Sequence, residues 1–100
     1  MFYKKYYNID DETISKLGLR VSTKPINASI APESRVFEHP HINDVFLMES
    51  DLYGNLMPEN SCFLAFHGRN GLMGKHLYIE ELRKLTKEDI ENIISSNSEG

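Results

Sequence analysis

The stretch at residues 61–76, SCFLAFHGRNGLMGKH, constrains the fold more than any other part of the chain. Five consecutive apolar residues at 62–66 are typical of a strand that is covered on both faces. Glycines follow at 68, 71 and 74, and Asn70-Gly71 predicts a tight turn at a hairpin tip, where a positive φ is needed. The sequence therefore predicts a central strand at 61–67 and, after it, a loop at 68–75 that displays Arg69, Leu72 and Met73.

The run VFLME at 45–49 is a second unbroken apolar stretch and predicts another buried strand. Turn residues separate it from the central strand, so 45–50 and 61–67 are expected to form an antiparallel hairpin. Residues 2–9 and 35–38 are further strand candidates. Residues 76–82 are ambiguous, because Tyr78 and Ile79 favour a strand whereas 80–84 favour a helix. A strand is the expectation there.

Two short helices are predicted, at about 10–17 and 86–96. The first has Asp10 as a candidate N-cap and Gly18 as a C′ residue, and the second has Thr86 as N-cap with Asp89 at N3. The resulting order, β-α-loop-β-β-β-β-α, is that of an α+β domain with a mostly antiparallel sheet of four to five strands.

The length of 100 residues predicts a single domain over 1–100. Pro25 and Pro32 favour a long loop over 23–34, and residues 97–100 are expected to be a frayed C-terminal tail. A domain of this size has little room for a deep internal cavity. A surface groove or a group of loops is therefore the expected form of any functional site.

The charge distribution favours a protein partner. The chain has 15 acidic residues against 11 Lys and Arg, a net charge of −4, and a nucleic-acid binder usually has a basic surface instead. Residues 31–60 contain Arg35 as their only base. A partner with a basic surface is the natural complement to such an acidic segment, and a nucleic-acid partner is not expected. The acids of this segment are Glu33, Glu38, Asp44, Glu49, Asp51 and Glu59.

Targeting and redox signals are absent from the sequence. A lone Cys62 forms no internal disulfide, the N-terminus lacks the apolar core of a signal peptide, and no apolar stretch has the length of a membrane span. A cytoplasmic location without a membrane partner is the expectation.

The histidines suggest an alternative site for chemistry. His39 and His41 are two residues apart, so they project to the same side of an extended segment and would share a metal ion, with His67 or His76 as third ligand. Without a metal, two of these four histidines would form an acid–base pair, with Arg35, Arg69 or Lys75 stabilising developing negative charge. This pattern predicts a small histidine-dependent hydrolase or nuclease, with or without metal. The leading interpretation includes no metal and no cofactor.

The glycine-rich segment does not match a phosphate-binding loop. The required first glycine is replaced by Arg69, and His76 stands where Ser or Thr would bind the metal ion. Cys62 is a poor nucleophile candidate, because an apolar environment raises the pKa of a thiol.

A binding function is favoured because the chain is small, acidic and without a catalytic motif. The expectation is a protein-binding or inhibitory module that neutralises a basic toxin or nuclease, as immunity and antitoxin proteins do. A homo-oligomer closed by hydrophobic loops is left open. The expected partner-binding residues are Glu38, Asp44, Glu49, Asp51 and Glu59 for electrostatic steering, with Tyr53, Arg69, Leu72 and Met73 as contact residues.

Overall fold

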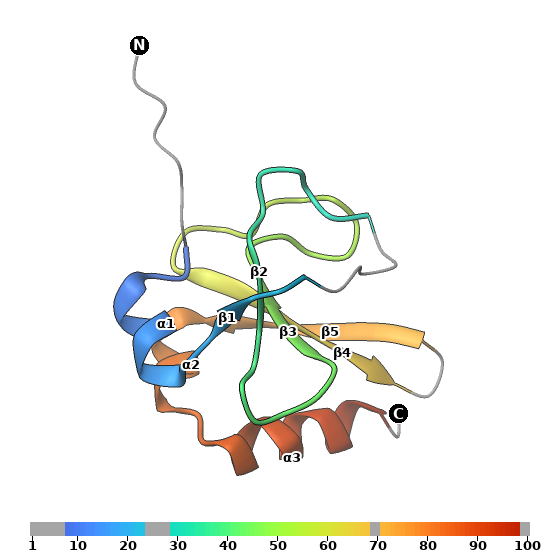
Figure 1. Ribbon diagram of the computed structural model, residues 1–100. Helices are drawn as coiled ribbons and strands as arrows, with labels where there is room; N and C mark the ends of the chain where they lie inside the picture. The colour runs from blue at the N-terminus through green and yellow to red at the C-terminus, as the bar shows by residue number, and fades with distance from the viewer. Residues whose placement is uncertain (1–7, 24–28, 69–70, 99–100) are drawn as a thin grey trace.

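A computed structural model describes residues 8–23, 29–68 and 71–98, and Figure 1 shows their arrangement. The chain forms a five-stranded antiparallel sheet in the order β1-β2-β3-β4-β5, in which each strand pairs with its neighbour in sequence. This confirms the predicted α+β class. The strands are β1 (Arg20–Val21), β2 (Val36–Glu38), β3 (Val45–Met48), β4 (Ser61–Gly68) and β5 (Gly71–Tyr78).

The hairpin of β3 and β4 confirms the predicted pairing of the two apolar runs. Val45 lies opposite Phe66 and Met48 opposite Phe63. All four residues of β3 are buried. Both faces of these strands are covered, which explains why their apolar residues are consecutive and do not alternate with polar ones.

The hairpin of β4 and β5 differs from the predicted glycine loop. Gly68 lies opposite Gly71, and β5 begins at Gly71, whose φ is +116°. Leu72 and Met73 are therefore strand residues and not residues of a loop spanning 68–75. Long-range pairing with β4 overrides the glycine-rich composition here, because β4 provides a ladder of backbone hydrogen bonds along the whole segment.

Two of the three described helices match the predicted ones. Helix α1 (Asp11–Leu17) ends at Gly18, whose φ of +69° is the left-handed C-cap conformation. Helix α3 (Lys87–Ser98) begins with a reciprocal cap: the Thr86 N–H donates to the Asp89 carboxylate at 2.9 Å, and the Asp89 N–H donates to the Thr86 hydroxyl at 3.1 Å. This helix continues to Ser98, beyond the point where the frayed tail was expected to begin.

The interpretation of 76–82 as a strand is correct for residues 76–78 and wrong for residues 79–82, which belong to the third helix. Strand β5 ends at Tyr78, and α2 (Ile79–Lys84) follows at once. The Glu81 carboxylate accepts the Tyr78 N–H at 3.2 Å and so caps the first turn. Ile79 and Leu82 are three residues apart and both buried, so a helical turn places both in the core, which a strand would not do.

The expected strand at 2–9 lies mostly outside the described residues, and Asn8 and Ile9 are not in a strand. Part of the expected long loop at 23–34 also lies outside them. Its described end packs against the body, where Ala31 is buried and its N–H donates to the Ser50 hydroxyl at 3.0 Å. No described helix has the length and apolar character needed to cross a membrane.

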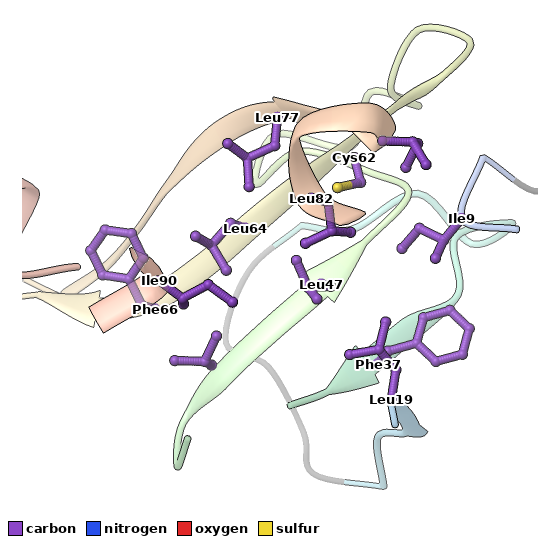
Figure 2. Packing of buried hydrophobic residues seen from close by; sticks show 12 residues of the cluster. Ile9, Leu19, Phe37, Leu47, Cys62, Leu64, Phe66, Leu77, Leu82 and Ile90 are labelled. Atoms are coloured by element: carbon purple, nitrogen blue, oxygen red, sulfur yellow. The ribbon is translucent and has the colours of Figure 1, made fainter. Parts of the chain in front are cut away.

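The larger core lies between the sheet and the helices. Figure 2 shows how side chains from the strands meet Leu82 of α2 and Ile90 of α3 on this face. Burial of this apolar surface is the main stabilising term, since the helices are too short to be stable alone. The buried members are Ile9, Leu19, Phe37, Val45, Leu47, Cys62, Leu64, Phe66, Leu77, Ile79, Leu82 and Ile90.

A smaller cluster covers the opposite face of the sheet. Phe46, Met48 and Ala65 are buried there, and Ile30 and Leu52 from the flanking connections pack against them with other partly buried residues. The central strands β3 and β4 are thus covered on both faces, and Leu52 attaches the connection between them to this second face.

Candidate functional site

The connection between β3 and β4 displays two exposed large side chains, and one of them, Tyr53, is the most exposed large hydrophobic side chain of the described residues. Here we call residues 51–59 the display loop; it lies at the end of β3 away from α3 (Figure 1). The side chain of Tyr53 is 85% exposed and that of Leu56 is 54% exposed. Binding residues are often carried by loops, so these two exposed side chains make the display loop a candidate contact surface.

Asp51 holds the first half of the display loop in one conformation. Its carboxylate accepts the backbone N–H groups of Tyr53 at 2.8 Å and Asn55 at 2.9 Å, and also the Asn55 side-chain amide at 3.1 Å. The Asp51 N–H donates in turn to the Asn55 carbonyl at 2.9 Å. The bond from the Asn55 N–H is the main reason that the pKa of Asp51 is lowered, because hydrogen bonds to the carboxylate favour its charged form.

The second half of the display loop is tied to the body of the protein. The Asn8 side-chain amide donates to the carbonyl oxygens of Met57 and Pro58, each at 3.0 Å. The Met57 N–H donates to the Glu49 carbonyl at 3.0 Å. The display loop is therefore a braced structure, and its exposed side chains are presented from a fixed backbone.

Glu49 does not belong to the partner surface for which the sequence predicted it. The residue is 2% exposed, and its carboxylate forms an ion pair with Arg35 at 2.9 Å. The carboxylate also accepts the Ile9 N–H at 3.0 Å. Glu49 directly follows the buried strand β3, and this position places its side chain in the interior. There the carboxylate connects separate segments of the chain and has almost no contact with solvent.

The other expected partner residues separate in space. Asp51, Tyr53 and Glu59 share the display loop, and Glu59 is exposed. Asp44 is exposed as well, but it lies at the opposite end of β3, in the turn near α3 (Figure 1). Glu38 is half-buried on β2.

The predicted apolar anchors after β4 are inside the fold. Leu72 packs on the smaller cluster and Met73 on the larger one, and both are partly buried in β5. Arg69 lies outside the described residues. Leu56 is an exposed apolar residue that sequence reasoning missed, and its position among Gly54, Asn55 and Pro58 was the available signal.

His39 and His41 are close together, and the ring of His39 takes part in the turn between them. Their ring centroids are 6.2 Å apart, and the His39 Nδ1 accepts the His41 backbone N–H at 3.1 Å. His39 is buried, and this loss of solvation lowers its pKa, so the neutral ring is favoured. The His39 Nδ1 therefore helps to hold the turn at residues 39–41.

The third histidine of the alternative site does not join this pair in a metal-binding group. In the described ranges, no three His, Cys, Asp or Glu side chains gather closely enough to hold a metal ion. His67 is exposed and instead lines a pocket of about 350 Å³ with Asp44 and Glu91. Arg35, one of the candidate cations of the acid–base alternative, is bound to Glu49.

Cys62 is a core residue. It is fully buried, and burial raises the pKa of its thiol to about 12. The thiolate is therefore scarce near neutral pH, and a nucleophilic role would require it.

Comparison with known proteins leaves the site to be interpreted from its own residues, because the chain matches no protein-family model, no curated protein and no solved structure.

Proposed function

We propose that this protein is a non-enzymatic binding module that contacts a basic partner protein through the display loop. The observation that carries the proposal is the exposure of Tyr53 on a loop whose backbone is held by hydrogen bonds. Tyrosine is enriched among the residues that dominate binding energy, because it buries a large area at a small cost in side-chain entropy. A rigid loop avoids the cost of ordering on binding.

The charge around the display loop supports a basic partner. Between residues 29 and 60, the only Lys or Arg is Arg35, and it is paired internally with Glu49. Asp51 and Glu59 are on the display loop itself. An acidic surface of this kind steers a basic partner toward it during the encounter. Neutralisation of a basic toxin or nuclease, as by an immunity or antitoxin protein, is the specific form of binding that we propose.

The hydrolase alternative has weaker support. Of its proposed residues, His39 is buried and accepts a backbone hydrogen bond, and Arg35 is held by Glu49. The binding proposal requires no rearrangement of side chains, because Tyr53, Leu56 and Glu59 are already exposed.

The test compares proteins captured from native lysate by immobilised wild-type protein and by a Tyr53→Ser/Leu56→Ser variant. The matched control is Val21→Ser, which removes another apolar side chain that is 70% exposed but lies on β1, outside the display loop. We expect a basic protein to be enriched on the wild type and on the control, and to be lost from the double variant. Circular dichroism checks that all three proteins are folded.

The proposal is wrong if the double variant captures the same proteins as the control with the same yield. It is also wrong if the proteins lost from the double variant are acidic. A salt titration of the captured complex adds a quantitative criterion, because electrostatic steering predicts slower association at higher ionic strength.

A further inference from the structure

Strand β5 is a long edge of the sheet with no described strand on its outer side. It is the last strand in the order β1-β2-β3-β4-β5, so only its inner side is paired. It pairs with β4 over eight consecutive residues without a bulge, and it contains no proline. Natural edge strands are commonly short, bulged or interrupted by proline, because a long regular edge invites a further strand. The opposite edge, β1, has only two residues, whereas β5 is left open.

The phase of the ladder shows which backbone groups of β5 point outward. Along an antiparallel pair, residues that hydrogen-bond to the neighbouring strand alternate with residues whose N–H and C=O point away from it. The Ile79 N–H donates to the Asn60 carbonyl at 2.8 Å and extends the register by one pair, so the odd-numbered residues of β5 are the bonded set. The Tyr78 N–H accordingly points outward, and it donates to the Glu81 carboxylate at 3.2 Å.

Three further residues of β5 turn their backbone groups outward: Leu72, Gly74 and His76. Within the described residues, no hydrogen bond to these outward N–H or C=O groups is formed. Donors and acceptors that alternate at every second residue are the complement of one more β-strand backbone. The edge therefore specifies an extended chain as its occupant.

We propose that this occupant is β5 of a second copy of the protein, in an antiparallel pair whose two-fold axis passes through Gly74. In this register Gly74 lies opposite its own equivalent, and Leu72 lies opposite His76 of the second copy. All the outward residues then pair, and each pair exchanges two backbone hydrogen bonds. Such an interface is isologous, because the same strand is its own complement.

The charges of the chain fit self-pairing at this edge. The net charge is −4, so two copies repel each other where acidic surfaces meet. Residues 61–79 contain no Asp or Glu, so β5 brings the copies together at an acid-free edge. Lys75 is the only Lys or Arg of β5, and in the proposed register it lies opposite Met73 of the second copy. A register centred on Lys75 would place two ammonium groups opposite each other, which is unfavourable.

The outward side chains favour a second copy over an unrelated strand. Leu72, His76 and Tyr78 share one face of β5, because they are an even number of residues apart. Tyr78 is 58% exposed, and its ring centroid lies 5.2 Å from that of His76. In the pair, His76 lies opposite Leu72 of the second copy, and Tyr78 reaches the same leucine on the diagonal. The two-fold axis repeats these contacts, which a strand of another protein does not do. No residue of the display loop takes part, so the inference does not depend on the proposed function.

The experiment is sedimentation equilibrium of the full chain, with His76→Pro compared with His76→Thr. Both variants lack the imidazole, but only proline removes the outward N–H. The β4 ladder does not use this N–H, and proline is tolerated on an edge strand in this position, so the variant should fold, as circular dichroism can check. We expect the wild type to be a dimer. The dimer dissociation constant of His76→Pro should exceed that of His76→Thr about tenfold or more, because each copy loses one donor.

The register has its own measurement in the wild-type protein. Isotope-filtered NMR of mixed labelled and unlabelled chains should give an intermolecular contact between the Met73 Hα and the Lys75 Hα, since these residues form a close pair without hydrogen bonds. If His76→Pro did not fold, this contact alone would decide the matter.

A wild type that stayed monomeric up to about 1 mM would overturn the proposal. Equal dimerisation by the two His76 variants, or an intermolecular contact elsewhere on the surface, would do the same. A strand-forming peptide, acetyl-Lys-Thr-Val-Thr-Val-Thr-Lys-amide, tests the other occupant. If it shifted the β5 amide signals of a monomeric chain, the edge would belong to a strand of another protein and the assignment to a second copy would be wrong.

Discussion

Glu49 and Arg35 form a bidentate ion pair inside the protein, with the Arg35 Nε 2.9 Å from Oε1 and Nη2 3.0 Å from Oε2. The same two side chains bind one residue of the N-terminal segment. The Ile9 N–H donates to the Glu49 carboxylate at 3.0 Å, and the Ile9 carbonyl accepts from Arg35 at 2.7 Å. This group of contacts joins the segment before α1 to the sheet.

We expect Glu49→Ala to reduce the free energy of unfolding by about 3–5 kcal/mol, because a mostly buried guanidinium then loses its counter-charge. Urea denaturation followed by circular dichroism measures this change. Replacing both partners, as in Arg35→Met/Glu49→Leu, should cost less than the single change, since neither charge remains. A loss below about 1 kcal/mol for Glu49→Ala would show that the pair is not needed.

Gly74 is expected to tolerate no side chain. A Cβ at this position would lie 2.6 Å from the Phe63 Cζ and 2.5 Å from the Leu64 carbonyl oxygen. We expect Gly74→Ala to lower stability by about 1–3 kcal/mol, the usual cost of overpacking. A double-mutant cycle with Phe63→Ala provides the check: the ring clash predicts partial recovery, whereas additive losses would exclude it.

His39 should make the protein more sensitive to mild acid. Burial lowers its pKa below the ordinary value of 6.5, so the unfolded chain binds a proton more readily than the folded one does. Stability is therefore retained above pH 6.5 and lost as the pH falls below it toward the folded pKa.

The matched variant for this effect is His39→Asn. Its side-chain oxygen can still accept the backbone N–H two residues later, and it does not titrate. We expect the unfolding free energy of the wild type to fall more than that of the variant between about pH 7.5 and 5.5. Parallel pH profiles would contradict the assignment.

Cys62 should be unreactive in the folded protein. With a pKa of about 12 and a fully buried sulfur, its thiol is both protonated and inaccessible near pH 8. Ellman's reagent should label one thiol per chain only after denaturation. Rapid stoichiometric labelling without denaturant would show that the core opens around β4.

Two variants of Asp51 test whether the hydrogen bonds to its side chain hold the display loop in its conformation. Asp51→Ala removes the acceptor for three hydrogen bonds, whereas Asp51→Asn keeps an oxygen for the N–H groups of Tyr53 and Asn55. Hydrogen exchange at these two amides should be accelerated by Ala and nearly unchanged by Asn. If both variants accelerated hydrogen exchange equally, the negative charge of Asp51 rather than its acceptor geometry would control the conformation of the loop.

Local signals in the sequence determined much of the fold. The unbroken apolar runs predicted β3 and β4 correctly. A strand that is covered on both faces has no solvent-facing side, so its apolar residues do not alternate with polar ones. Gly18 and the reciprocal pair Thr86 and Asp89 marked helix ends through interactions within a few residues. These features could be predicted because the atoms that cause them are neighbours in the chain.

Tertiary structure decided the rest. Pairing with β4 drew Leu72 and Met73 into a strand, and core packing of Ile79 and Leu82 replaced an expected strand by α2. Tertiary structure also decided the positions of the candidate site residues. Glu49 is the internal counter-ion of Arg35, and Asp44 lines a pocket together with residues of α3. The physical reason is that burial and charge pairing depend on residues distant in sequence, and an acid alone does not indicate whether an arginine will lie beside it.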